Sequence, residues 1–392
     1  MTTRRSMLKR LAVGAAATTG VVALAPAEAN AATTALGDIE LDSFTGTDDA
    51  KLTLALAAAR ASNPRRAIRL SARSHTFTQT RTAFSGLRIL GPNVGWQNPE
   101  IAGTSGALPQ CTVTLNCGTG ARSWLVGTST TYNVTVAGIA FKSSNAQTQF
   151  YHHPYSAGTS YASMFDTLTF YGFKHVFGLP SDPFSMTLCT FRGSWTCVAV
   201  QDTQFSLRGS DNFLWCAGEI NYGWQGANGG RYLMRFSNLS KTAVKHMYLT
   251  ARGGSRAVLV EGPNSQQGGL DISDCVIEGQ NAGDPAMGAL VVVKGGGVSL
   301  TNTKLNFGMA RPSDFTDQKD TALVMVQGGT ALISNTWTNR ASATSESVPV
   351  VAVSGGSAYV DRLIGMGGNW TAKPVVARSS GTLVADSTAR VA

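Results

Sequence analysis

The chain has 392 residues, of which 14% are charged, and its formal net charge is +9 at pH 7. Arg4, Arg5, Lys9 and Arg10 against Glu28 account for part of that charge, so residues 32–392 carry about +6, a mild excess that favours an anionic partner. No cluster of Lys and Arg interleaved with aromatic residues occurs, and this excludes a typical nucleic-acid-binding surface.

The first 31 residues have the pattern of a signal peptide. A basic start containing Arg4 and Arg5 precedes a short Ala- and Gly-rich apolar run, and the small residues Ala29 and Ala31 form a cleavage pattern. The paired arginines resemble the twin-arginine export signal, and an ordinary secretory signal is the alternative. We therefore expect residues 1–31 to be removed and the mature protein to be secreted and extracellular. A membrane anchor is not expected, because the apolar run is short and no other stretch could span a bilayer.

Residues 32–109 are predicted to form an N-terminal cap with the first strands. A short strand is expected at 38–41, followed by a turn in which a Thr or Asp caps a helix over 51–61. Leu52, Ala55, Leu56 and Ala59 recur at helical spacing, so this helix should bury one face. Two apolar segments, 67–70 and 87–91, should then begin the sheets. An amphipathic helix covers the end of a stack of strands well.

Residues 110–392 are predicted to form a single stack of coils. The clearest signal lies in the last third, where a short apolar run followed by a polar residue recurs five times, at 257–262, 290–295, 323–328, 350–355 and 375–380. The steps between equivalent positions are 33, 33, 27 and 25 residues, and a second apolar phrase follows each first one. Two strands per period without a helix between them indicate a right-handed parallel β-helix, an all-β solenoid. Val292, at the centre of one run, is expected to point into the coil.

An Asp or Asn follows each second phrase, at 274, 302, 335, 361 and 386. Stacked coils would bring these residues to one corner, where their side chains can bond the turn backbone. Calcium binding is the less favoured alternative, because single carboxylates one coil apart make weak ligands.

The motif FTGTDD at 44–49, the Ala/Leu helix after it and Ile68-Arg69-Leu70 together resemble the start of the pectate-lyase-like superfamily of right-handed β-helices. The superfamily includes polysaccharide lyases, polygalacturonase-like hydrolases, fructan-cleaving transferases and phage tail-spike depolymerases. The resemblance implies the fold and a polysaccharide substrate, and it transfers no catalytic residue. It also allows a homotrimer, since trimers are common among the members of this group.

Two long segments, 150–161 and 208–224, interrupt the middle coils, and long loops on a rigid scaffold often carry function. The second contains Asp211 and Glu219 beside large aromatic side chains. Two carboxylates and aromatic platforms are what glycoside cleavage needs, so Asp211 and Glu219 are candidate catalytic residues. A structural role at the coil corners is the alternative for both. Candidate substrate-binding residues here are Trp215, Tyr222 and Trp224.

A basic and aromatic strand follows at 245–252. His246 and Tyr248 are candidate catalytic residues and Lys245 and Arg252 candidate substrate-binding residues, because a lyase needs a base and a cation that neutralises a uronate carboxylate. Residues 219 and 246 are 27 apart, one coil of the repeat, so Glu219 is expected to lie beside His246 or Tyr248. A solvated strand face is the alternative. His152 and His153, in the 150–161 loop, are further candidates for substrate contact.

No metal site and no cofactor are expected. The six cysteines, at 111, 117, 189, 197, 216 and 275, lack the spacing and the His neighbours of a zinc site. Pairs 111–117 and 189–197 could form disulfides in an oxidising compartment, and buried free thiols are equally expected.

These observations predict a secreted enzyme that cleaves a polysaccharide by hydrolysis, elimination or transfer. A non-catalytic β-helix that binds glycan, or serves a structural role as tail-spike shafts do, is the alternative. Products from a polysaccharide panel would separate the two.

Overall fold

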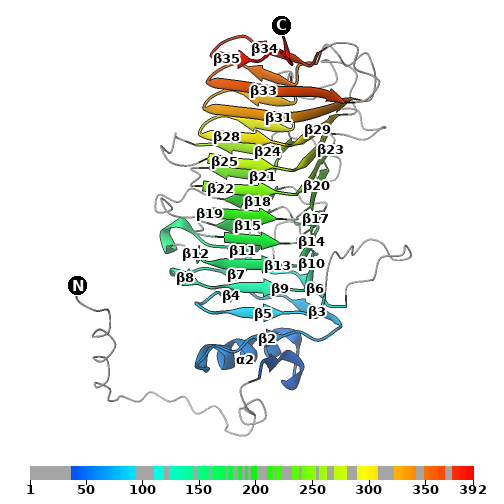
Figure 1. Ribbon diagram of the computed structural model, residues 1–392. Coiled ribbons are helices and arrows are strands. Elements are labelled where there is room, and N and C mark those ends of the chain that lie inside the picture. Colours follow the sequence, from blue (N-terminus) through cyan, green and yellow to red (C-terminus); the bar gives the residue numbers. More distant parts are fainter. Residues whose placement is uncertain are drawn as a thin grey trace, which may run out of the picture.

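Three walls of short parallel strands, stacked coil upon coil, make up the molecule (Figure 1). The computed structural model describes residues 37–93, 110–118, 123–144, 149–158, 160–173, 175–179, 184–187, 190–192, 196–200, 210–214, 217–221, 232–237, 241–252, 256–262, 269–279, 289–307, 322–340, 348–366 and 373–392. Each strand pairs in parallel with strands of the neighbouring coils, so the predicted mostly-β architecture with parallel sheets is confirmed.

Wall 1 and wall 2 together form the larger sheet. The strands of wall 1 are β1 (Ile39–Glu40), β2 (Ile68–Arg69), β5 (Arg88–Leu90), β9 (Thr135–Ala137), β13 (Ser163–Asp166), β16 (Phe184–Thr187), β19 (Ser210–Leu214), β22 (Lys241–Lys245), β25 (Gly269–Ser273), β28 (Gly297–Thr301), the first parts of β31 (Thr330–Arg340) and β33 (Ser357–Met366), and β35 (Thr382–Ala385). The strands of wall 2 are β3 (Ser74–Phe77), β6 (Thr112–Leu115), β10 (Ala140–Ser143), β14 (Thr169–Tyr171), β17 (Thr190–Arg192), β20 (Ala217–Asn221), β23 (Tyr248–Arg252), β26 (Val276–Gly279), β29 (Lys304–Phe307) and the second parts of β31 and β33.

Wall 3 is a separate sheet of twelve strands. Its members are β4 (Arg81–Thr82), β7 (Ser123–Val126), β11 (Gln149–His152), β15 (His175–Leu179), β18 (Thr196–Val200), β21 (Tyr232–Ser237), β24 (Arg256–Glu261), β27 (Val291–Val293), β30 (Val324–Val326), β32 (Val351–Val353), β34 (Val375–Arg378) and β36 (Arg390–Val391). Two short strands, β8 (Thr131–Tyr132) and β12 (Ser160–Tyr161), form a small sheet at the corner where wall 3 leads into wall 1. A short helical turn, η2 (Tyr155–Ala157), precedes β12.

The register of wall 3 reproduces the repeat found in the sequence. Val260 pairs with Val293, Val293 with Val326, Val326 with Val353 and Val353 with Arg378, which are the predicted steps of 33, 33, 27 and 25 residues. The second phrase follows the prediction through Ile333. It then shifts by one residue, because Ile333 pairs with Val360 and not with Tyr359.

Helix α2 (Asp48–Ala61) caps the first coil, and η1 (Leu41–Ser43) precedes it (Figure 1). Thr47 is its N-cap and accepts a hydrogen bond from the Ala50 backbone N–H. Leu52, Ala55 and Ala59 are buried, as the spacing predicts. The Asp49 carboxylate accepts hydrogen bonds from the backbone N–H and the hydroxyl of Thr78 and pairs with Arg81 at 3.0 Å, so it fastens the helix to the second coil.

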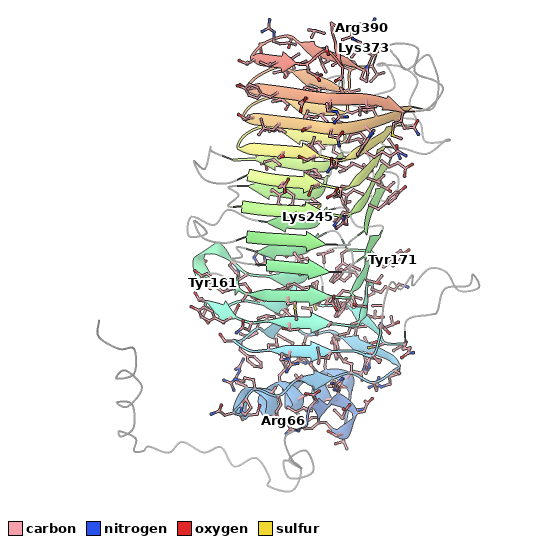
Figure 2. The ribbon with its side chains drawn as sticks, viewed as in Figure 1. Arg66, Tyr161, Tyr171, Lys245, Lys373 and Arg390 are labelled. Atoms are coloured by element: carbon pink, nitrogen blue, oxygen red, sulfur yellow. The ribbon has the colours of Figure 1, made fainter. Side chains whose placement is uncertain are left out.

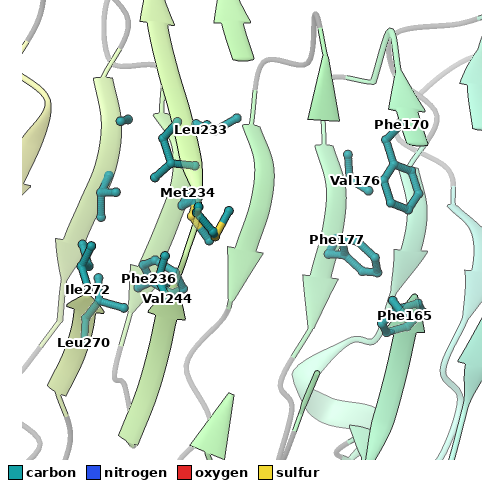
Figure 3. Close-up of a cluster of buried hydrophobic side chains, with 14 of the residues drawn as sticks. Phe165, Phe170, Val176, Phe177, Leu233, Met234, Phe236, Val244, Leu270 and Ile272 are labelled. Atoms are coloured by element: carbon teal, nitrogen blue, oxygen red, sulfur yellow. The ribbon is translucent and has the colours of Figure 1, made fainter. Parts of the chain in front are cut away.

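The interior of the stack changes character along its length. In the coils near the cap it is aromatic, with Phe150 at 4.7 Å from Phe141 and 4.9 Å from Phe170, measured between ring centroids. Beyond β21 it is aliphatic, and Figure 3 shows the change from Phe165, Phe170 and Phe177 to Val244, Leu270 and Ile272. Larger side chains occupy the coils in which fewer residues per strand point inward, so the core stays filled throughout.

The expected orientation of Val292 is wrong. Val291 and Val293 belong to the main core, whereas Val292 lies in a second buried cluster with Leu259, Met325 and Ala352 on the other side of wall 3. Alternation along a strand requires this outcome once the two flanking residues point inward. All three positions are apolar, so the sequence run alone could not separate the two faces.

Candidate functional site

The outer side of wall 2 brings carboxylates and hydrogen-bonding groups into line. On this wall Leu249, Ile277 and Leu305 point into the core, so the residues on either side of them point outward. One outward line contains Ala217, Tyr248, Val276, Lys304, Trp337 and Ile364. The next contains Glu219, Thr250, Glu278, Asn306, Asn339 and Met366. Successive members lie one coil apart, about 4.8 Å.

A phenol and a carboxylate are bonded to each other at the centre of this surface. The Tyr248 hydroxyl donates a hydrogen bond to the Glu278 carboxylate, and 45% of Tyr248 is exposed. Glu219 occupies the register position two coils before Glu278, with Thr250 between them. The backbones of the two glutamates are therefore about 10 Å apart, from which glutamate side chains can approach a common ligand.

An unsatisfied acceptor lies one coil beyond Glu278. Asn306 pairs with Glu278 in the register, and its buried Oδ1 has no hydrogen-bond partner among the residues that the structure describes. Buried polar atoms normally have partners, so this amide is suited to meet a donor on a ligand.

Glu278 and Asn306 were missed in the sequence, although a signal for them exists. Glu278 lies four residues after Asp274, Asn306 four after Asn302, and Thr250 four after His246. Each of these first residues is at the corner between walls 1 and 2, so the fourth residue beyond the corner falls in the same outward line.

The expected contact between Glu219 and His246 or Tyr248 is wrong. Glu219 pairs with Thr250, and Tyr248 pairs with Ala217. The coil between β20 and β23 has 31 residues, not the 27 assumed from the repeat, so the register moves by one coil position.

His246 lies at the corner between walls 1 and 2 and not on a strand. Its backbone φ is 52°, and the equivalent residues Asp274, Asn302 and Asn335 have φ values of 54°, 49° and 45°. The Asn335 side chain donates to the Asn302 side chain at 2.5 Å, so the predicted ladder exists at these coils. In the last of them the corner residue is Arg362, with φ 54°, and Asp361 stands one residue earlier, so that part of the predicted ladder is wrong.

Asp211 falls in a line of buried positions. It pairs with Thr242, which is followed by Leu270 and Val298, and all three are at most 2% exposed. This register favours a structural role for Asp211. Lys245 is exposed at the end of β22 and pairs with Leu214 and Ser273 (Figure 2). Arg252 pairs with Asn221 at the end of wall 2.

Trp215, Tyr222 and Trp224 lie outside the described residues.

The two histidines of the 150–161 loop differ from each other. His153 is fully buried, its ring nitrogens lie 2.9 Å from the Ser129 carbonyl oxygen and 3.3 Å from that of Pro154, and its ring covers Gly127 so closely that a Cβ there would overlap it. The expected substrate contact is therefore wrong for His153. His152 is half-buried at the end of β11, and burial, with the neighbouring His153, lowers its pKa.

Cys111, Cys117 and Cys275 are free and buried, so the 111–117 disulfide is absent, and cysteines 189 and 197 have no described side chains. Burial raises the pKa of the Cys111 and Cys275 thiols to about 12, which makes both unreactive. Within the described ranges, no three His, Cys, Asp or Glu side chains are grouped closely enough to hold a metal ion. No helix in that part of the chain is long and apolar enough to cross a membrane.

No protein-family model and no curated protein matches this sequence. Three solved structures resemble the chain in fold. DFA-IIIase from Arthrobacter chlorophenolicus A6, in complex with GF2, has a TM-score of 0.54 at 10% identity over 88% of this chain and 92% of its own. The Agl-KA catalytic domain has a TM-score of 0.54 at 11% identity over 91% of this chain and 69% of its own. A double mutant of the tailspike protein of E. coli bacteriophage HK620 has a TM-score of 0.53 at 10% identity over 89% of this chain and 63% of its own. At these identities the likeness is one of fold, the architecture of stacked parallel strands.

Proposed function

We propose that the chain is a right-handed parallel β-helix that acts on a polysaccharide at the outer side of wall 2. The observation that carries the proposal is the Tyr248–Glu278 hydrogen bond, in register with Glu219 two coils away. A carboxylate bonded to a phenol can move a proton to or from a sugar oxygen or carbon, and a second carboxylate supplies the partner that glycoside cleavage needs. The fold likeness to DFA-IIIase, the Agl-KA catalytic domain and the HK620 tailspike supports a glycan as the ligand.

The roles follow from position. Glu278 is the proposed acid or base, with Tyr248 as its proton-sharing partner, and Glu219 is the proposed second carboxylate. Asn306 would bind a donor on the sugar, and Lys245, exposed beyond the end of β22, would attract an anionic chain. No cofactor or metal takes part in this scheme. His246 is left out, because a corner residue is held by the turn.

We also propose that residues 1–31 are a twin-arginine-type signal and that residues 32–392 form one secreted domain. The order of basic, apolar and small residues in the sequence supports the export signal. A homotrimer is the proposed assembly, as the resemblance to tail-spike proteins suggests. Size-exclusion chromatography with light scattering on residues 32–392 tests it, and a monomeric mass would contradict it.

The test of function is a product assay on a panel of neutral and anionic polysaccharides, with wild type, Glu278→Gln, Glu219→Gln and Tyr248→Phe. Absorbance from a new conjugated double bond would identify elimination, and reducing ends without it would identify hydrolysis. Glu278→Gln and Glu219→Gln should each lower the rate by about a hundredfold or more with an unchanged melting temperature. Asp361→Asn is the matched control, because it removes an exposed carboxylate at the far end of wall 1 and should change nothing.

The competing function is glycan binding without cleavage. Wild-type binding with no product from any polysaccharide would favour it. Full activity in both glutamate variants would contradict the proposed site.

A further inference from the structure

Two tyrosines form a stacked, exposed pair at the corner between walls 3 and 1, far from wall 2. Tyr132 in β8 pairs in register with Tyr161 in β12. Their ring centroids are 5.2 Å apart and the rings are nearly parallel, at 12°. Figure 2 shows Tyr161 on one flank of the molecule and Tyr171, a wall 2 residue, on the opposite flank. This pair therefore lies outside the site proposed above.

The backbone holds both rings outward. The residue after each tyrosine, Asn133 or Ala162, has a positive φ, of 57° or 51°, which turns the chain sharply into wall 1. Beneath the rings, the Ser160 hydroxyl lies 3.3 Å from that of Thr131, 3.2 Å from that of Tyr151 and 2.6 Å from that of Ser163. These hydroxyls are buried, so they fix β8 and β12 to the stack. The ring pair is thus a rigid surface, ready for a ligand.

One face of Tyr132 is open. The register Ile89–Val136–Phe165 places Ser85 one coil before Tyr132, at the position that Tyr132 and Tyr161 occupy in their own coils. Ser85 accepts a hydrogen bond from the Tyr132 backbone N–H at 3.1 Å, and its side chain is too small to cover the ring. Half of Tyr132 is exposed, at 50%. A flat ring with one face covered by a second ring and the other open to solvent suits a sugar ring.

Positive charge borders the open face. Arg60, Arg65 and Arg88 are exposed, and none forms an ion pair with a carboxylate among the described residues, whereas Arg69, Arg73 and Arg81 all do. Arg65 lies against Gly86, the residue next to Ser85, since a Cβ at Gly86 would be 3.0 Å from the Arg65 Cγ. Arg60 and Arg65 also lie over the Phe84 ring, at 4.8 and 5.8 Å. The guanidinium groups beside Tyr132 are therefore available to an anion.

We propose that Tyr132 and Tyr161, with Arg65, bind a carboxylated polysaccharide, independently of whether wall 2 is catalytic. A sugar ring of the polymer stacks on the open face of Tyr132, and its uronate carboxylate meets the Arg65 guanidinium. Stacking selects a pyranose ring and the charge selects a uronate over a neutral sugar. The site would hold a long substrate along the coils, away from the cleavage point.

The test is affinity electrophoresis of residues 32–392 in gels containing polygalacturonate, with dextran as the neutral polymer. Wild type should be retarded by polygalacturonate and not by dextran, and the retardation should fall as salt rises. Tyr132→Ala should weaken binding roughly three- to tenfold, the range expected for one aromatic contact, and Arg65→Gln should weaken it similarly. Tyr359→Ala is the matched control, because Tyr359 is 43% exposed at the far end of wall 1 and should not contribute.

Ser85→Phe provides a second variant that removes no aromatic side chain. The new ring would cover the open face of Tyr132, so binding should be lost while the melting temperature is kept. Wild-type affinity in Tyr132→Ala or Ser85→Phe would overturn the proposal, as would equal retardation by dextran. The variant Glu278→Gln should bind polygalacturonate as wild type does, so failure of the cleavage site and failure of this site give different results.

Discussion

His246 shows how a single backbone angle limits what a side chain can do. A non-glycine residue with φ near 50° is uncommon, and Asn and Asp adopt this conformation more readily than other residues. Of its three equivalents at the same corner, one is Asp and two are Asn. The position is therefore selected first for the turn, and a catalytic role for this histidine is hard to reconcile with it.

We predict that His246→Asn keeps both stability and any activity, whereas His246→Val loses stability. Asn suits the left-handed region, and a β-branched residue there costs about 1–2 kcal/mol. Thermal unfolding of the two variants, beside a product assay, measures both effects. Loss of activity in a fully folded His246→Asn would restore the histidine to the site.

A second histidine makes stability depend on pH. Burial lowers the pKa of His75, whose side chain is almost fully buried and lies 3.2 Å from the Ser71 carbonyl oxygen. The unfolded chain therefore binds a proton at this site at a higher pH than the folded chain does. Stability is fully present above about pH 6.5 and falls as the pH drops below it.

We predict that the melting temperature falls between pH 7.5 and pH 5, and that His75→Gln reduces this fall. Gln retains a donor for the Ser71 carbonyl and does not titrate. His152, whose pKa is also lowered, should account for part of the remaining slope. An unchanged slope in His75→Gln would show that His75 does not contribute.

At the scale of the element, the tightest constraint is a column of glycine turns between walls 3 and 1. Gly296, Gly329, Gly356 and Gly381 have φ values of 70°, 70°, 73° and 78°. A Cβ at Gly329 would lie 2.3 Å from the Gly296 carbonyl oxygen, and one at Gly356 would lie 2.3 Å from that of Gly329. Each turn thus rests directly on the backbone of the turn before it.

We predict that Gly329→Ala destabilises the protein by more than Gly118→Ala does. Both glycines have positive φ, but a Cβ at Gly118 would meet nothing within 4 Å. Gly118→Ala should therefore cost only the conformational strain, about 1–2 kcal/mol, and Gly329→Ala that strain plus the steric overlap. Chemical denaturation of the two variants gives the difference, and equal losses would mean that the turns can separate without cost.

For the whole molecule, the last third was predictable because its period is written in β-branched runs and glycine. The step lengths, the parallel walls and the helical cap all follow from the sequence, since local pattern and stacking agree there. The site did not follow, because the coil that separates Glu219 from Thr250 is longer than the C-terminal repeat. The orientation of Val292 could not be read either, because both faces of wall 3 are apolar.

We predict that one complete coil can be removed. Val324 pairs with Val351, so deleting residues 324–350 leaves Leu323 followed by an equivalent strand, and the inward and outward faces are kept. Deleting 324–349 instead would move each following side chain to the opposite face. The first variant should retain the β-type circular dichroism spectrum and a cooperative transition, and the second should not. Failure of both to fold would mean that this coil is needed for more than stacking.

The glycine turns also bear on how such a chain can change over generations. The corner that they form is three residues long in each of the last coils, at 294–296, 327–329, 354–356 and 379–381, and admits no side chain at its tightest point. The connection from wall 2 to wall 3 varies instead, from residues 253–255 in one coil to 308–323 in another. Innovation is therefore channelled to one edge of the stack: insertions accumulate where the backbone leaves wall 2, beside Glu278 and Asn306, while the opposite edge holds the coils in register.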